Sequence, residues 1–152
     1  MALEIARTRI SGELLESDVQ QLPFPDACFD VTFAVTVCEF TIDVGATVAE
    51  LVRVTRPGGR VIIGSLNRHS LWGRWHRRQF GQPPWDTATF LDRRQLDRIA
   101  SAHGARTWRS GLYAPGALPG LERWGPILER LGRRFAAGSG AFEVVTIALP
   151  IG

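Results

Sequence analysis

The histidine and cysteine residues of this sequence do not have the spacing of a metal centre. The chain of 152 residues contains three histidines and two cysteines, whereas a structural zinc site uses four such ligands in closely spaced pairs. We therefore expect no metal. All 18 basic residues are arginines, which excludes a Schiff-base lysine and the lysine of a phosphate-binding P-loop. A histidine general base stays open, and no residue is assigned a catalytic role.

The segment "NRHSLWGRWHRRQFGQPPW" contains the first candidates for substrate contact. Asn67, His69 and Trp72 lie nearest to the predicted strand that precedes this segment, so we predict that they face a substrate, with residues 66–90 as a lid or wall. An amphipathic helix that only covers the sheet is an equally good interpretation. Binding to a membrane surface or to single-stranded nucleic acid is less favoured. Tyr113, near the end of a later strand, is a further substrate candidate.

The charge is distributed unevenly along the chain. Residues 1–50 hold two arginines and nine acidic residues, a net charge of −7, while residues 51–152 hold sixteen arginines and six acidic residues, a net charge of +10. A basic region of this kind can meet phosphates or anionic lipid. Because the arginines are scattered, we favour a solvated surface.

The composition indicates one cytoplasmic domain that spans residues 1–152. The hydrophobic fraction of 45% and the charged fraction of 22% are ordinary for a globular protein. The cysteines lie in or beside apolar runs, which suits free thiols in a reducing compartment. No signal peptide or membrane-spanning run is visible.

Hydrophobic periodicity predicts alternating strands and helices. A short helix is expected at 1–10, and later helices at 44–55, at 92–103 with Asp92 as its N-cap, and near 121–135. Strands are expected at 13–18, 30–37, 60–65, 105–113 and 142–149. The 30–37 strand is apolar on both faces, as for a strand covered by helices on both sides. The pattern predicts an α/β fold with a mostly parallel sheet and a C-terminal antiparallel strand pair, with 66–90 and 114–140 as lid or insert segments.

Two stretches, "LPFPDACFDVTFAVTVCEF" and "ELVRVTRPGGRVIIGSLNRHSLW", resemble the class I S-adenosylmethionine-dependent methyltransferases, and within them the ubiquinone-biosynthesis C-methyltransferases. The family has an acidic residue after its third strand and an L-P-F-x-D-x-x-F-D link into the fourth. A helix and an R-x-x-x-P-G-G turn then lead into the fifth. Here these features correspond to Asp18, to residues 22–30 and to residues 53–59.

The resemblance implies S-adenosylmethionine as cofactor and a small molecule as methyl acceptor. It implies that the Asp18 carboxylate accepts a hydrogen bond from the adenine amino group and that the Val19 amide meets an adenine ring nitrogen. It places Ala34 and Val35 beside the methionine part of the cofactor. Methyl transfer depends largely on holding the acceptor in line with the methyl group, so the missing catalytic signature does not argue against this activity.

The sequence departs from the family before Asp18. The family begins with a strand and a Gly-rich turn that receives the methionine carboxylate, and its second strand ends in an acidic residue that binds the ribose. Here the only glycine before Asp18 is Gly12. We therefore expect an incomplete Rossmann-like fold without the first two strands of the family, in which residues 1–10 correspond to the helix after strand two.

The alternative to a methyltransferase is then a cofactor-incompetent relic or accessory domain that needs another chain. Three origins of the gap stay open: a truncated or misassigned start, a third strand that packs directly on the fourth, or a partner that supplies the missing strands. That partner could be a second copy of the chain.

Overall fold

The computed structural model describes most of the chain. Its described residues are 8, 11–67, 69–70, 73–74, 85–113, 121–136 and 138–152. The predicted helix at 1–10, apart from Thr8, and the predicted substrate residue Trp72 lie outside them.

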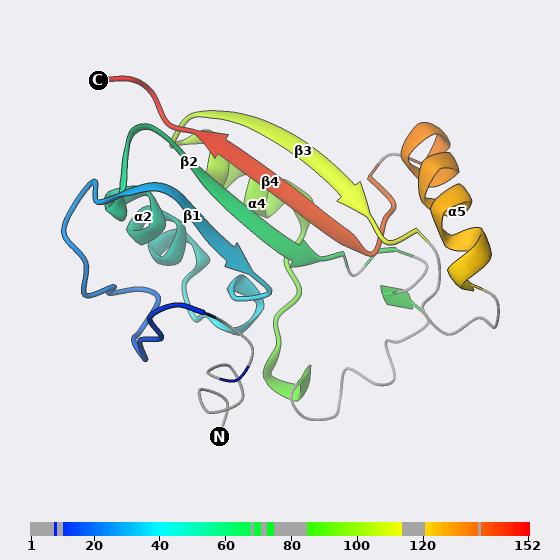
Figure 1. Ribbon diagram of the computed structural model, residues 1–152, viewed down its shortest axis with the longest axis horizontal. Coiled ribbons are helices and arrows are strands. Elements are labelled where there is room, and N and C mark those ends of the chain that lie inside the picture. The colour runs from blue at the N-terminus through cyan, green and yellow to red at the C-terminus, as the bar shows by residue number, and fades with distance from the viewer. Residues whose placement is uncertain are drawn as a thin grey trace.

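The described elements alternate between strands and helices along the chain (Figure 1). In chain order they are β1 (Phe29–Val35), η1 (Cys38–Phe40), α2 (Val44–Val54), β2 (Thr55–Leu66), η3 (Trp85–Thr87), α4 (Arg93–Ser101), β3 (Ala105–Gly111), α5 (Leu121–Phe135) and β4 (Phe142–Ala148). The three later predicted helices and the four later strands are therefore confirmed within a few residues at their ends. The exception is β2, which begins five residues earlier than expected and includes the Pro-Gly-Gly turn.

The four strands form one sheet in the order β1-β2-β4-β3. β1 pairs with β2 in parallel, with Phe33 opposite Ile62, and β2 pairs with β4 antiparallel. β3 and β4 are also antiparallel. The α/β class and the C-terminal antiparallel pair are confirmed, and the sheet is mixed.

Aspartates start the two helices that pack on the sheet. The Asp43 side chain accepts a hydrogen bond from the Ala46 amide (3.0 Å), and Asp92 accepts one from the Arg94 amide (3.1 Å). Each carboxylate satisfies an amide that has no partner within its helix. The prediction that Asp92 is the N-cap of the helix now labelled α4 is confirmed.

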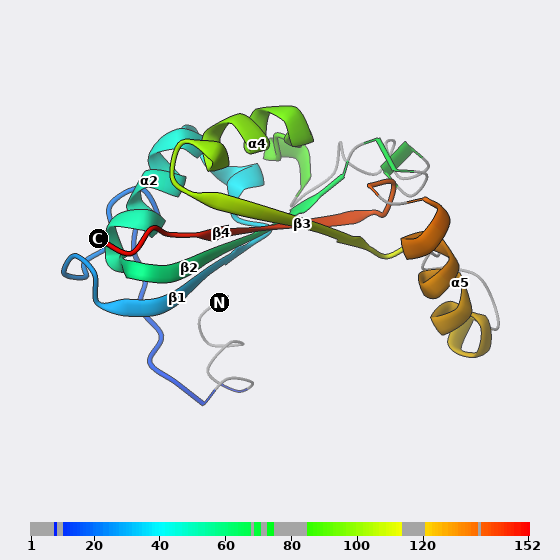
Figure 2. The same cartoon turned by 90° about the horizontal axis from the view of Figure 1, so that it is seen from above.

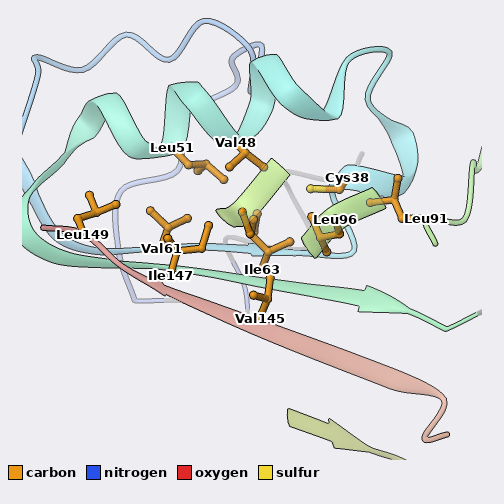
Figure 3. Packing of buried hydrophobic residues seen from close by; sticks show 12 residues of the cluster. Cys38, Val48, Leu51, Val61, Ile63, Leu91, Leu96, Val145, Ile147 and Leu149 are labelled. Atoms are coloured by element: carbon orange, nitrogen blue, oxygen red, sulfur yellow. The ribbon is translucent and has the colours of Figure 1, made fainter. Parts of the chain in front are cut away.

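The hydrophobic core lies on one face of the sheet, beneath α2 and α4 (Figures 2 and 3). Alternate residues of β2 and β4 point toward it, as the strand period of two requires. The buried cluster includes Val48, Leu51, Val61, Ile63, Leu96, Ala100, Val145 and Ile147.

The opposite face of β1 is uncovered, and here the prediction was wrong. Only Thr32 and Ala34 of this strand are buried, while Val31, Phe33 and Val35 are 38%, 65% and 54% exposed. Both described helices that pack on the middle of the sheet lie on its other face (Figure 2). β1 therefore keeps the composition of a doubly covered strand but is covered on one side.

The predicted strand at 13–18 is also absent from the described structure. Residues 13–18 follow an irregular path that ends in a turn at Asp18. A strand needs a neighbour for its backbone hydrogen bonds, and no described strand lies beside this segment. Within the described part of the chain, no helix has the length and apolarity to cross a membrane.

Candidate functional site

Arg53 of α2 fastens the proline-containing link to the body of the fold. Its guanidinium donates to the carbonyl oxygens of Leu22 (3.1 Å) and Phe24 (2.9 Å) and to Asp26 Oδ1 (2.5 Å). Glu50, one helical turn before Arg53, accepts from it at 2.9 and 2.7 Å. The planar guanidinium suits this multiple contact. The link between Asp18 and β1 is thereby held against α2.

A hollow of about 470 Å³ lies between this N-terminal segment and the end of β1. Asp18 and Val19 line one side of it, and residues 36–37 and 40–42 line the other. The hollow sits beyond the carboxyl end of a parallel strand, where open α/β sheets bind their ligands.

Asp18 and Val19 present an acceptor and a donor next to each other. Asp18 Oδ1 accepts from the Gln20 amide (2.9 Å), and the Asp18 carbonyl accepts from the Gln21 amide (3.0 Å). The second carboxylate oxygen and the Val19 N–H make no hydrogen bond within the described residues. The turn therefore fixes this pair and leaves both groups available to a ligand.

Thr36 is a residue of this hollow that the sequence did not reveal. Its φ of 52° lies in the left-handed region, where β-branched residues are strained. The Thr36 amide donates to the Gly64 carbonyl (2.8 Å), and its hydroxyl donates to the Val35 carbonyl (2.8 Å). Strain of this kind collects at ligand sites, but threonine is not a residue from which positive φ can be inferred in advance.

The structure places Ala34 and Val35 on opposite faces of β1. The Ala34 side chain is 2% exposed and belongs to the core, while Val35 lies on the uncovered face. Neither side chain lines the hollow beside Asp18. Their assignment to the methionine part of the cofactor stays a prediction.

Glu39 is a second residue that the sequence did not single out. It is 1% exposed, and its Oε1 accepts from the Leu66 amide at 2.7 Å. Its Oε2 is buried without a hydrogen-bond partner, and burial raises the pKa of this carboxyl group. Glu39 thus joins the segment after β1 to the end of β2.

Asn67 and His69, both predicted to face substrate, lie directly after β2. Asn67 is buried, and its side-chain amide donates to the carbonyl oxygens of Gly138 (3.3 Å) and Gly140 (3.1 Å). Its side-chain oxygen accepts from the exposed His69 amide (2.9 Å). Asn67 is therefore occupied in holding the loop before β4.

Tyr113 is joined to Asn67 through a chain of hydrogen bonds. The Tyr113 hydroxyl lies 2.6 Å from Ser110 Oγ, which accepts from the Gly138 amide (3.0 Å). The Gly138 carbonyl in turn accepts from Asn67. The two residues thus lie at the same end of the sheet, beyond the carboxyl ends of β2 and β3, although they come from segments far apart in the sequence.

No described group of three or more His, Cys, Asp or Glu residues could hold a metal ion. Cys38 is buried among apolar side chains, and burial together with the adjacent Glu39 raises the pKa of its thiol to about 11. That thiol is not a nucleophile at neutral pH.

A family model described as a methyltransferase domain matches residues 1–63. This range contains both the Asp18 turn and the link that Arg53 holds.

Curated relatives match parts of this chain. A malonyl-[acyl-carrier protein] O-methyltransferase of Serratia marcescens is 41% identical over 70 residues, 45% of this chain and 28% of that protein. An uncharacterized methyltransferase of Mycobacterium sp. (strain KMS) is 30% identical over 118 residues, 75% of this chain and 44% of that protein. The chain spans less than half the length of these two relatives.

The fold is similar to that of a solved S-adenosylmethionine-dependent methyltransferase of Thermotoga maritima, described as a possible histamine N-methyltransferase. The TM-score is 0.76 at 23% sequence identity, and the match covers 96% of this chain and 68% of that one. A likeness at this identity shows the fold.

Proposed function

We propose that this chain takes part in methyl transfer from S-adenosylmethionine to a small-molecule acceptor, as its match to a methyltransferase-domain model, its relatives and its fold support. We assign the hollow beside Asp18 to the adenine end of the cofactor. The observation that carries this assignment is the free carboxylate oxygen of Asp18 beside the free N–H of Val19.

The hydrogen-bonding groups of this turn match an adenine edge. Adenine presents an amino donor beside a ring-nitrogen acceptor, so it needs one acceptor and one donor from the protein. A carboxylate accepts only, and a backbone amide donates only. The Asp18–Val19 pair has this order, and the turn holds it in place before any ligand binds.

The chain's own contribution to the reaction is to position the cofactor and to shield it from water. S-adenosylmethionine supplies a methyl group on a positively charged sulfur, which an acceptor oxygen, nitrogen or carbon can attack. Asp18 and Val19 hold one end of the cofactor, and Thr36 and Val37 form the wall at the end of β1. Orientation of this kind can account for a large share of a rate enhancement.

The Serratia relative is named for O-methylation of a malonyl-[acyl-carrier protein]. We propose a small-molecule acceptor for this chain, without assigning the methylated atom.

A second candidate function is that of an accessory domain completed by another chain. β1 pairs with β2 on one side and with no described strand on the other, and its apolar side chains are exposed. An uncovered apolar edge of this kind invites pairing. A second copy or a separate protein would then supply the contacts to the ribose and the methionine carboxylate. Light scattering tests this alternative, because a stable monomer that binds the cofactor tightly would contradict it.

The adenine assignment is tested by nuclear magnetic resonance. Titration of the ¹⁵N-labelled protein with S-adenosylhomocysteine should shift the amide signals of residues 17–20 and 36–42. The amides of β3, at the far edge of the sheet, serve as the internal control. Shifts confined to β3 and α5 would contradict the assignment.

A further inference from the structure

Figure 1 shows that β3 ends beside α5, at the side of the sheet away from β1. Two adjoining hollows lie at this place. The first, here called the cationic hollow, has a volume of about 570 Å³ and is lined by Arg93, Arg109 and Arg133. Trp108 and Tyr113 also line it. Three guanidinium groups around one space suit an anionic group, since arginine binds carboxylate and phosphate with paired hydrogen bonds.

Two of these arginines have no acidic partner. Within the described part of the chain, Arg109 and Arg133 make no ion pair or side-chain hydrogen bond. Arg93 lies 4.7 Å from the centre of the Trp108 ring and 3.5 Å from the buried carboxylate of Glu143. The stacking holds Arg93 in place. The lining contains three arginines and no acidic residue, so the hollow keeps a positive charge.

The second hollow, here called the apolar hollow, has a volume of about 350 Å³. Leu128, Leu131 and Phe135 of α5 line one side of it, and Leu112 and Ala141 line the other. Tyr113 lines both hollows, so they adjoin. A cationic space and an apolar space therefore meet at one side chain.

The seating of α5 leaves its apolar side uncovered. Glu129 accepts from the amides of Leu112 (3.2 Å) and Tyr113 (2.6 Å), and Gly132 is so close to the Tyr113 ring that a Cβ there would clash. The helix thus meets the rest of the protein through its small and polar side. The apolar residues elsewhere on α5 are 38–76% exposed: Trp124, Ile127, Leu128, Leu131 and Phe135. A contiguous exposed apolar patch of this kind marks a binding surface.

We propose that the two hollows together bind one anionic amphiphile, with its charged group among the arginines and its apolar chain against α5. The inference rests on the proposed function in one respect: it names this amphiphile as the class of methyl acceptor. The arginines match the charge of such a molecule, and the exposed leucines and phenylalanine match its chain. When that chain packs against α5, apolar surface of both the chain and the helix is removed from water, which lowers the free energy.

The hollows also have a direction relative to the Asp18 turn. The apolar hollow reaches Ser70, which follows the carboxyl end of β2. β2 is the neighbour of β1, whereas the arginines lie around β3, three interstrand spacings or about 14 Å from β1. The acceptor is therefore an elongated molecule whose apolar part extends toward the cofactor half-site and carries the nucleophilic atom at that end.

Calorimetric titration with monomeric decanoate, decanol and inorganic phosphate tests this inference. We expect decanoate to bind at least about 10-fold more tightly than decanol or phosphate, because only decanoate fills both hollows. The double variant Arg109→Gln/Arg133→Gln should bring decanoate to the affinity of decanol. Leu131→Ser should weaken decanoate and decanol alike. Arg98→Gln, an exposed arginine of α4, is the matched control and should change nothing.

Three results would overturn the proposal. The first is equal binding of decanoate and decanol by the wild type, with circular dichroism showing that the protein is folded. The second is phosphate binding as tight as decanoate binding and insensitive to Leu131→Ser. The third is binding to anionic phosphatidylglycerol vesicles but not to monomeric decanoate, which would make α5 a membrane-docking helix. If the wild type binds decanoate but does not bind S-adenosylhomocysteine, the proposed function is contradicted while the amphiphile site is supported.

Discussion

The Oε1 atom of Glu39 lies 2.7 Å from the backbone nitrogen of Leu66, so a buried carboxylate joins the segment after β1 to the last residue of β2. These two strand ends form the edge of the sheet beside which Asp18 lies. The Glu39 backbone carbonyl also accepts from the Thr89 amide at 2.7 Å. A single residue thus connects three segments around the proposed cofactor half-site.

Glu39→Ala should lower the free energy of unfolding by about 1–3 kcal/mol, because the Leu66 amide loses its acceptor in a buried place. Chemical denaturation monitored by circular dichroism measures this. Glu39→Gln keeps an oxygen at the position and is the matched control. Equal stability of the alanine variant and the wild type would contradict the structural role.

Glu39→Gln should also change how stability depends on pH. Burial raises the pKa of Glu39 above its ordinary value of 4.5, so the folded state holds a proton that the unfolded state releases. Stability from this group is present below pH 4.5 and falls as the pH rises through the folded pKa. The unfolding midpoint of Glu39→Gln, measured as its difference from the wild-type midpoint, should therefore increase between pH 4 and pH 7. A constant difference across this range would contradict the buried carboxyl.

Arg53→Ala should lower the thermal midpoint by about 5 °C or more, because the residue holds three groups of the link as well as Glu50. The thermal midpoint of Arg53→Lys should lie between those of wild type and Arg53→Ala, since an ammonium group cannot reproduce the planar contacts of the guanidinium. Differential scanning fluorimetry measures the midpoints. Arg56→Ala is the control, because among the described residues Arg56 pairs only with the exposed Asp30. Equal effects of the two alanine substitutions would show that the link is not fastened as described.

Asp97 should make the protein sensitive to acid. The hydrogen bond from Arg106, assisted by that from Trp108, lowers the pKa of this carboxyl from 3.8 to about 2. Its stabilising effect is therefore present above pH 4 and is lost as the pH falls from about 4 to 2. Asp97→Asn should melt a few degrees below wild type at pH 7, and this difference should vanish near pH 2. A difference that is independent of pH would contradict the ion pair. The control is Asp86→Asn, because Asp86 is exposed and forms no ion pair within the described part of the chain.

The two cysteines should differ in reactivity. Cys28 is exposed, while Cys38 is buried with a thiol pKa raised to about 11. The native protein should therefore release one equivalent of chromophore with dithionitrobenzoate at pH 8, and a second equivalent only when unfolded. Cys28→Ser should abolish the fast reaction. Two fast equivalents in the native protein would show that Cys38 is accessible.

The sequence predicted those elements whose signals are local. The apolar spacing in 44–55 and the Asp92 cap each predict an element from a few adjacent residues. The strands at 30–37 and 142–149 were predicted from their β-branched runs. Local signals therefore determined the order of elements and the α/β class.

Features that depend on distant contacts could not be predicted from the sequence. The strand expected at 13–18 fails because no described neighbour pairs with it, and Phe33 is exposed because no described helix covers that face. The hydrogen bonds from Asn67 to the loop at 138–140 join residues about seventy positions apart, and its role toward a substrate stays a prediction. The clamp formed by Arg53 joins residues about thirty positions apart, which no periodicity reveals.

A cofactor half-site at Asp18 is tested most directly by calorimetric titration with S-adenosylhomocysteine on wild type, Asp18→Ala and the control Glu16→Ala. Glu16 is an exposed acid of the same segment that does not line the hollow. Micromolar binding, roughly −8 kcal/mol, that Asp18→Ala weakens at least about 10-fold and Glu16→Ala leaves unchanged is the predicted result. Absence of binding to the folded wild type, or equal binding by all three proteins, would contradict a cofactor half-site at Asp18.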